Sequence, residues 1–211
     1  MPQYAEDLYA TAARASGSDA AGQGDRKEYN FIFAGNIGDM QSVETIIQAA
    51  NELTAWPAIR FHLVGDGSKL DACKKLADKL GLANVTFYGR QPVTEMPRFY
   101  GLADAMLVTL QANRMLSYTL PGKVQSYMAA GKPIIGAING ETSQVISQSG
   151  CGFCCAAGDY KEFATLILRF SQSDDKEQMA ARSRQFYDEH YRKSRFFMEL
   201  EAALDRLRKA G

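Results

Sequence analysis

The chain has 211 residues, 46% of them hydrophobic, which is enough for one large globular domain or two small ones with a substantial core. Its 24 lysines and arginines balance its 24 acidic residues, so overall charge excludes a general attraction to nucleic acid, and any site for an anion has to be local. The sequence contains no apolar run long enough to cross a bilayer and no secretory signal pattern.

Strands and helices are expected to alternate after an irregular start. Residues 1–28 show little periodicity, and "ASGSDAAGQGD" is typical of a flexible linker. The expected strands from residue 29 onward are "YNFIFAG", "IRFHLVG", "VTFYG", "AMLVTL", "KPIIGAI" and "CGFCCA". The expected helices cover residues 39–53, 68–80, 95–100, 121–130 and 144–150, and further helices fill the chain from residue 160 to the C-terminus.

This order predicts the fold class. Strands that are separated by helices and are too continuously apolar for an exposed face favour a parallel sheet covered on both sides. We therefore predict an α/β domain over residues 29–211, with a doubly wound, mainly parallel, Rossmann-like sheet. Such sheets bind ligands at the carboxyl ends of their strands, where the strand order reverses.

The stretch "YTLPGKVQSYMAAGKPIIG" places a lysine at an unfavourable position. Pro121 and Gly122 suit the opening of a helix, so Lys123 falls in its first turn, where the helix dipole disfavours a cation. A bound phosphate would explain Lys123, because free N–H groups, the dipole and the ammonium would all meet it there. The alternative is that Lys123 extends into solvent, where the mismatch costs only a few tenths of a kcal/mol.

Three other loops at strand ends are candidates for ligand contact. In "AGNIGD", Gly35 and Gly38 allow close backbone approach to an anion, or simply form a tight turn. In "VGDGSKL", Asp66 is expected to be a turn residue or helix N-cap, because a nicotinamide site would want G-x-G-x-x-G after the first strand. In "INGETSQV", Glu141 faces a ligand hydroxyl or suits a helix start.

Four cysteines bear on metal and redox chemistry. Cys151 and Cys154 have the spacing of a redox pair or of half a zinc site, and Cys155 and Cys73 complete the set. A second half-site is missing from the sequence. We therefore favour a short buried strand that uses cysteine as a small hydrophobe, in a protein of the reducing cytoplasm.

Five motifs together carry a resemblance to a known family. They occur in the order "FAGNIGDMQSVETIIQAANEL", "FHLVGDGSKL", "VTFYGRQP", "YGLADAMLVTL" and "YTLPGKVQSYMAAGKPIIG". From residue 29 onward the chain resembles the C-terminal, donor-binding half of a family 4 glycosyltransferase of the GT-B fold, of the group that assembles capsule, exopolysaccharide and O-antigen. The opening "MPQYAEDLY" is similar to the end of the interdomain connection.

The resemblance implies an activity and its charge contacts. A sugar is moved from a nucleotide sugar, commonly a UDP- or GDP-sugar, with retention of anomeric configuration and usually without a metal or other cofactor. Gly35, Asn36 and Ile37 would approach the donor phosphates. Lys123 would neutralise the diphosphate as it leaves, which is stabilisation of developing charge by a preorganised cation.

Other donor contacts are implied with departures from the usual pattern. Arg90 lies where the family contacts the base, and Pro121 and Gly122 would line the pocket. Many members carry two glutamates that hold the hydroxyls of the donor sugar and ribose, and these positions are Tyr118 and Ser126 here. The Ser126 hydroxyl could still hydrogen-bond the donor.

The usual basic pair after the first strand is also replaced. Asn36 and Gln41 occupy those positions, so Lys123 is left as the main cation, with Arg114 as a second candidate. The Asn36 amide could still contact the donor. The resemblance implies that a separate N-terminal domain binds the glycan or lipid-linked acceptor, so the chain as given is expected to bind nucleotide without transferring sugar.

Two other functions stay open from sequence alone. The loss of the two glutamates would fit a non-catalytic nucleotide-binding module, and the Rossmann pattern alone would fit an NAD-dependent oxidoreductase. We expect no nucleic-acid partner. The basic stretches "HYRKSRFF" and "DRLRKAG" read as a solvated helical face, with a peripheral role at the inner face of the plasma membrane as the alternative.

Overall fold

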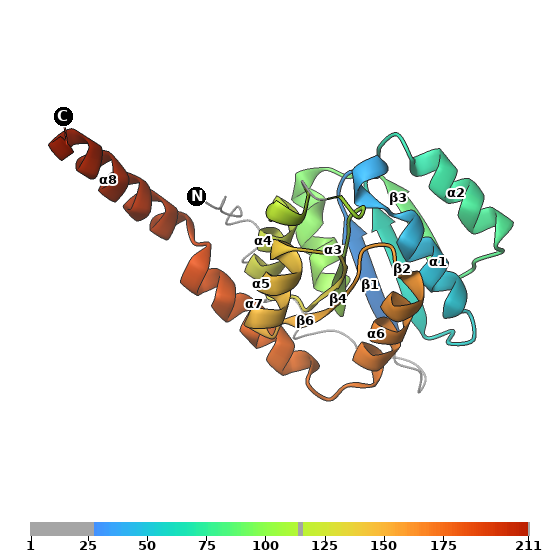
Figure 1. Cartoon of the computed structure of the whole chain (residues 1–211). Helices are drawn as coiled ribbons and strands as arrows, with labels where there is room; N and C mark the ends of the chain where they lie inside the picture. The colour runs from blue at the N-terminus through green and yellow to red at the C-terminus, as the bar shows by residue number, and fades with distance from the viewer. Residues whose placement is uncertain (1–27, 114–115, 211) are drawn as a thin grey trace.

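A computed structural model describes residues 28–113 and 116–210. The expected linker therefore lies, except for Glu28, outside the described residues, and so does Arg114. All six expected strands are present and pair in parallel in the order β3-β2-β1-β4-β5-β6 (Figure 1). Their bounds are β1 Tyr29–Ala34, β2 Ile59–Val64, β3 Val85–Gly89, β4 Ala105–Thr109, β5 Ile134–Ala137 and β6 Gly152–Cys155.

Helices cover both faces of this sheet, which confirms the doubly wound α/β prediction. The helices are α1 Glu44–Glu52, α2 Leu70–Lys79, α3 Met96–Leu102, α4 Gly122–Ala129, α5 Glu141–Ser149, α6 Tyr160–Gln172, α7 Lys176–His190 and α8 Lys193–Ala210. The described residues also form the 3-10 turns η2 Asp39–Gln41, η3 Val93–Glu95 and η4 Leu116–Tyr118. In Figure 1, α8 points away from the body of the domain.

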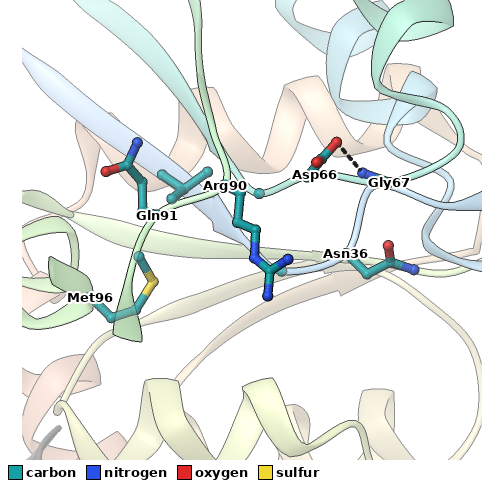
Figure 2. A pocket seen from close by; sticks show the side chains of 9 residues that line it. Asn36, Asp66, Gly67, Arg90, Gln91 and Met96 are labelled. Atoms are coloured by element: carbon teal, nitrogen blue, oxygen red, sulfur yellow. Dashed lines mark hydrogen bonds between the residues drawn. The ribbon is translucent and has the colours of Figure 1, made fainter. Parts of the chain in front are cut away.

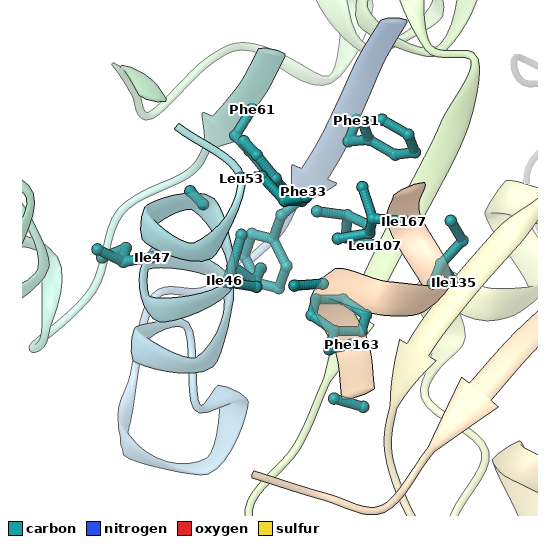
Figure 3. Close-up of a cluster of buried hydrophobic side chains, with 14 of the residues drawn as sticks. Phe31, Phe33, Ile46, Ile47, Leu53, Phe61, Leu107, Ile135, Phe163 and Ile167 are labelled. Atoms are coloured by element: carbon teal, nitrogen blue, oxygen red, sulfur yellow. The ribbon is translucent and has the colours of Figure 1, made fainter. Parts of the chain in front are cut away.

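The two faces of β1 build two separate cores, because successive side chains of a strand point to opposite faces. Phe31 and Phe33 pack with α1, α2 and α6, and Figure 3 shows part of this cluster. Ile32 and Ala34 pack on the other side with α3, α4, α5 and α7. All four side chains are buried, so β1 is fixed at the centre of the sheet and its carboxyl end is held in a defined place.

The expected helix over residues 39–53 is broken. The chain first forms η2, then passes through Ser42 in the left-handed region (φ 46°), and α1 begins only at Glu44. Gln41 is thereby held outside α1, at the carboxyl edge of the sheet. The apolar spacing that predicted one helix is satisfied by α1 alone, through its buried residues Ile46, Ile47 and Ala50.

The cysteine-rich stretch forms β6 with the buried Cys151 before it, so the predicted strand is confirmed. The four cysteines are free. Burial raises the pKa of the Cys154 and Cys155 thiols to about 12. Among the described residues, no three His, Cys, Asp or Glu side chains gather closely enough to hold a metal ion. None of the described helices combines the length and apolarity that crossing a bilayer requires.

His62 makes folding stability sensitive to acid. Its Nδ1 lies 2.8 Å from the Tyr88 hydroxyl and its Nε2 lies 2.8 Å from Asn30 Oδ1. Burial lowers the pKa of His62 below 6.5, with a smaller opposing effect of Glu28. The unfolded chain therefore binds this proton more readily, so stability is fully present above about pH 6.5 and falls as the pH drops through the folded-state pKa.

We expect the free energy of unfolding to fall less steeply with acid in His62→Gln than in the wild type. Urea unfolding at pH 8, 6.5 and 5.5 measures this. The other histidine, His190, provides the matched control as His190→Gln, because its side chain is 46% exposed. Equal acid dependence in the wild type and His62→Gln would contradict the assignment.

Candidate functional site

The strand order reverses at the centre of the sheet. Connections from β1 run outward through β2 to β3, whereas those from β4 run the other way to β5 and β6, so the order reverses between β1 and β4. Loops that follow these two strands diverge there, which is where doubly wound sheets bind ligands. The ladder between β1 and β4 is short, with only Phe31–Ala105 and Ile32–Met106 in register.

Tyr127 of α4 closes the gap that this short ladder leaves. Its buried hydroxyl donates to Ala34 O (2.9 Å) and accepts from Ala34 N–H (3.1 Å), so one side chain satisfies both main-chain groups at the end of β1. The ring packs edge-on against Tyr100 at 5.5 Å between centroids. Tyr127 therefore fixes the point at which the loop after β1 leaves the sheet.

A pocket of about 590 Å³ opens over the carboxyl ends of β1, β2 and β3. Three loops form its wall, and the residues that line it are Gly35, Asn36, Val64, Gly65, Asp66, Gly67, Arg90, Gln91 and Met96. Figure 2 shows the Arg90 guanidinium between Met96 on one side and Asn36 on the other. The structure thus brings together three of the predicted site residues, Gly35, Asn36 and Arg90.

Glycines allow two of these loops to touch. Gly65 has a φ of +144°, and a Cβ at this position would lie 1.8 Å from Gly35 O. Gly67 is similar, with a φ of +155° and a Cβ position 2.4 Å from Ile37 O. Asp66 between them is exposed and accepts from Gly67 N–H (2.7 Å), so it is the turn residue that the sequence predicted and not the N-cap of α2.

Lys123 lies behind Gly35, in the first turn of α4 as predicted. Its ammonium is 4.1 Å from the centre of the Phe33 ring and donates to Gln41 Oε1. A Cβ on Gly35 would be 3.0 Å from Nζ, so the ammonium lies against the backbone of the pocket wall. Burial lowers the pKa of Lys123 to about 7. The side chain therefore does not extend freely into solvent.

Gln41 connects Lys123 to the carboxyl end of β4 and to the loop after β1. Its main-chain oxygen accepts from Thr109 Oγ1 (2.5 Å), at the end of β4, and its N–H donates to Gly38 O (3.0 Å). The Gln41 amide thus joins the loop after β1 to α4, across 82 residues of sequence. At this position the family resemblance implied a basic residue, and here the positive charge comes from α4 instead.

The remaining predicted residues lie along the start of α4 and α5, outside the pocket lining. Pro121 and Gly122 begin α4, whose first N–H groups have no capping side chain. Ser126 bonds Gly122 O within the helix (3.2 Å). Tyr118 is 70% exposed, and the exposed Glu141 begins α5. Neither the Tyr118 side chain nor the Ser126 side chain lines the pocket.

Ile37 differs from its predicted role. Its side chain is fully buried in the core with Phe33, its N–H donates to Asp66 O (2.8 Å), and its carbonyl accepts from Lys69 N–H (2.9 Å). Because both main-chain groups are already paired, Ile37 shapes the loop rather than facing the pocket.

Sequence reasoning missed Gln91, Met96 and the hydroxyl of Tyr127. Gln91 lies in the motif "VTFYGRQP" but was assigned no role, and Met96 lies in no motif. Tyr127 is buried on α4, and no sequence pattern indicated a partner for its hydroxyl. The G-D-G spacing was the available signal for Gly65 and Gly67, although it predicted only a tight turn.

Comparison with known proteins places the chain in a family. The model of the glycosyl transferases group 1 matches residues 19–186, which is most of the chain. The chain belongs to this family. The loop after β1 also lacks the G-x-G-x-x-G motif of a dinucleotide site. These two observations together argue against a nicotinamide-dependent oxidoreductase.

Two curated relatives are longer than this chain. WbjE of Pseudomonas aeruginosa, named as a glycosyltransferase, is 34% identical over 68% of this chain and 36% of its own length. WcaI of Escherichia coli K12, named as a glycosyl transferase of colanic acid biosynthesis, is 33% identical over 47% of this chain and 24% of its own. The chain therefore spans about a third or less of these two relatives.

A solved structure shares the fold of this chain. Anabaena Alr3699/HepE, solved in complex with UDP-glucose, superposes with a TM-score of 0.74 at 18% identity. The match covers 85% of this chain and 49% of that one. At 18% identity, this likeness shows that the two chains share the Rossmann-like fold.

Proposed function

We propose that this chain is the donor-binding half of a retaining glycosyltransferase that uses a UDP- or GDP-sugar. The observation that carries the proposal is that the pocket of about 590 Å³ and the Lys123 ammonium both lie against Gly35. A nucleotide diphosphate needs this combination, which is a cavity for the nucleoside next to a cation and free helix N–H groups for the phosphates. Membership of group 1 supports the same activity.

Each side chain has a defined task in this proposal. Lys123 and the N-terminus of α4 stabilise the negative charge that develops on the leaving diphosphate. Arg90 contacts the nucleoside, and Gly35 and Asn36 let the phosphates approach the backbone of the loop after β1. On the α4 side, Ser126, Tyr118 and Glu141 reach sugar hydroxyls only if the donor extends beyond the pocket.

We further propose that binding needs no metal or other cofactor, because Lys123 itself supplies the charge. The acceptor is a growing glycan or a lipid-linked glycan, held by another domain, and the pathway is cell-surface polysaccharide synthesis. The name of the relative WcaI, which refers to colanic acid biosynthesis, supports this part of the proposal. Free cysteines fit a reducing cytoplasm, with peripheral contact to the inner face of the membrane. Fractionation of cells that produce the protein tests this location.

Calorimetric titration tests the donor site. We expect UDP or GDP to bind the wild-type chain with unchanged affinity in EDTA, and NAD not to bind. Lys123→Ala should weaken binding by about 1–3 kcal/mol, the range for a charge-assisted hydrogen bond. The matched control is Lys79→Ala, an exposed lysine at the last position of α2, toward the opposite edge of the sheet.

Equal binding by Lys123→Ala and the wild type would contradict the role of Lys123. Binding without any transfer or hydrolysis of a nucleotide sugar, measured on the protein together with its acceptor-binding domain, would favour the non-catalytic nucleotide-binding module instead.

A further inference from the structure

Lys123 is surrounded by groups that hold it without fixing its charge. β1 contributes the Phe33 ring, the following loop contributes the backbone of Gly35, and η2 contributes the Gln41 amide. The acidic side chain of η2, Asp39, is paired instead with Lys69, at 2.8 Å from its Nζ. Within the described part of the chain, burial is the cause of the lowered pKa of Lys123, and no charged side chain contributes to that shift.

The Gln41 oxygen suits both states of the lysine. An amide oxygen accepts a hydrogen bond from a neutral amine as well as from an ammonium, because both carry N–H donors. A carboxylate at the same place would instead attract the ammonium strongly and hold it charged. Gln41 is also rigidly placed, since its main chain bonds both Thr109 and Gly38.

We propose that Gln41 is a positioning residue that keeps Lys123 beside Gly35 in either protonation state. A nucleoside diphosphate that binds next to Gly35 then causes Lys123 to take up a proton. This inference rests on the proposed donor site. The proton comes from the solvent and forms the fourth bond of the Lys123 nitrogen, and no covalent bond of the ligand changes. Donor affinity should therefore decline in alkaline solution, where protonating the lysine becomes more costly.

The burial of Lys123 gives the expected size of this effect. With a pKa of about 7 in the free protein, most of the Lys123 side chains are neutral at pH 8. The UDP phosphates are already fully ionised at this pH, because their last pKa is near 6. Uptake measured at pH 8 therefore reports on the protein and not on the nucleotide.

The decisive variant is Gln41→Glu, which changes shape very little and gives Lys123 a carboxylate partner. Calorimetry of UDP binding at pH 8, in buffers of different ionisation enthalpy, counts the protons taken up. We expect uptake of most of one proton in the wild type and a clearly smaller uptake in Gln41→Glu, with UDP binding about 10- to 100-fold weaker in the variant. Lys123→Ala should take up almost none.

A measurement without ligand separates this inference from the proposed function. The ¹³Cε signal of Lys123, assigned by its loss in Lys123→Ala, should titrate about 1–3 pH units higher in Gln41→Glu than in the wild type. Gln41→Met, which keeps the length and removes the acceptor, checks folding by its melting curve and should take up a proton while binding UDP more weakly.

Two results would overturn the proposal. One is equal Lys123 titration in the wild type and Gln41→Glu, and the other is equal proton uptake by these two proteins. If the wild type binds neither UDP nor GDP, the donor-site function fails for this chain, and the ¹³Cε titration still decides whether Gln41 sets the state of Lys123.

Discussion

Gly65→Ala is expected to lower the free energy of unfolding by about 3–5 kcal/mol and to abolish nucleotide binding. The new methyl group would lie 1.8 Å from Gly35 O, which is backbone and cannot rotate away. The alanine would also have to adopt a φ of +144°, a region that is strained for any residue with a Cβ. The loops after β1 and β2 must then separate, and the wall of the pocket is lost.

Gly81→Ala provides the control for the backbone term. Gly81 also has a positive φ, +65°, but a Cβ there would meet nothing within 4 Å. We expect this variant to lose only about 1 kcal/mol and to keep nucleotide binding. Urea unfolding and calorimetry measure both variants. Equal losses of stability in the two proteins would show that close contact between the loops does not matter.

Tyr127→Phe is expected to destabilise the protein by about 2–4 kcal/mol, although it removes only one oxygen atom. The loss leaves both Ala34 N–H and Ala34 O unpaired in a buried place, and each unpaired group costs about 1–3 kcal/mol. Nucleotide binding should weaken as well, because the loop that carries Gly35 and Asn36 begins directly after Ala34.

Tyr118→Phe is the matched control, because its side chain is 70% exposed. Losing an exposed hydroxyl should change stability by no more than about 0.5 kcal/mol. Urea unfolding of the two variants at pH 7.5 gives the comparison. A Tyr127→Phe protein that is as stable as Tyr118→Phe would mean that water replaces the lost hydroxyl at the end of β1.

Only part of the site could be predicted from local sequence. Gly35, Asn36 and Arg90 follow strands, and parallel strands end at one edge, so their convergence follows from the alternating pattern. Gln91 follows β3 as Arg90 does, but nothing in the sequence singled it out. Met96 could not be found in this way, because its place depends on how η3 and α3 turn back over the edge after β3, which no local pattern specifies.

The sequence by itself determined the six strands, the two-sided covering of the sheet and the position of Lys123 in the first turn of a helix. These features follow from apolar periodicity and from helix-start residues, which act over a few neighbours. The tertiary structure alone decided where the Lys123 ammonium goes. Its partners are Gln41, 82 residues away, and the face of Phe33 on β1. The crossovers that set the strand order bring these residues together, so the contact depends on the packing of the whole sheet.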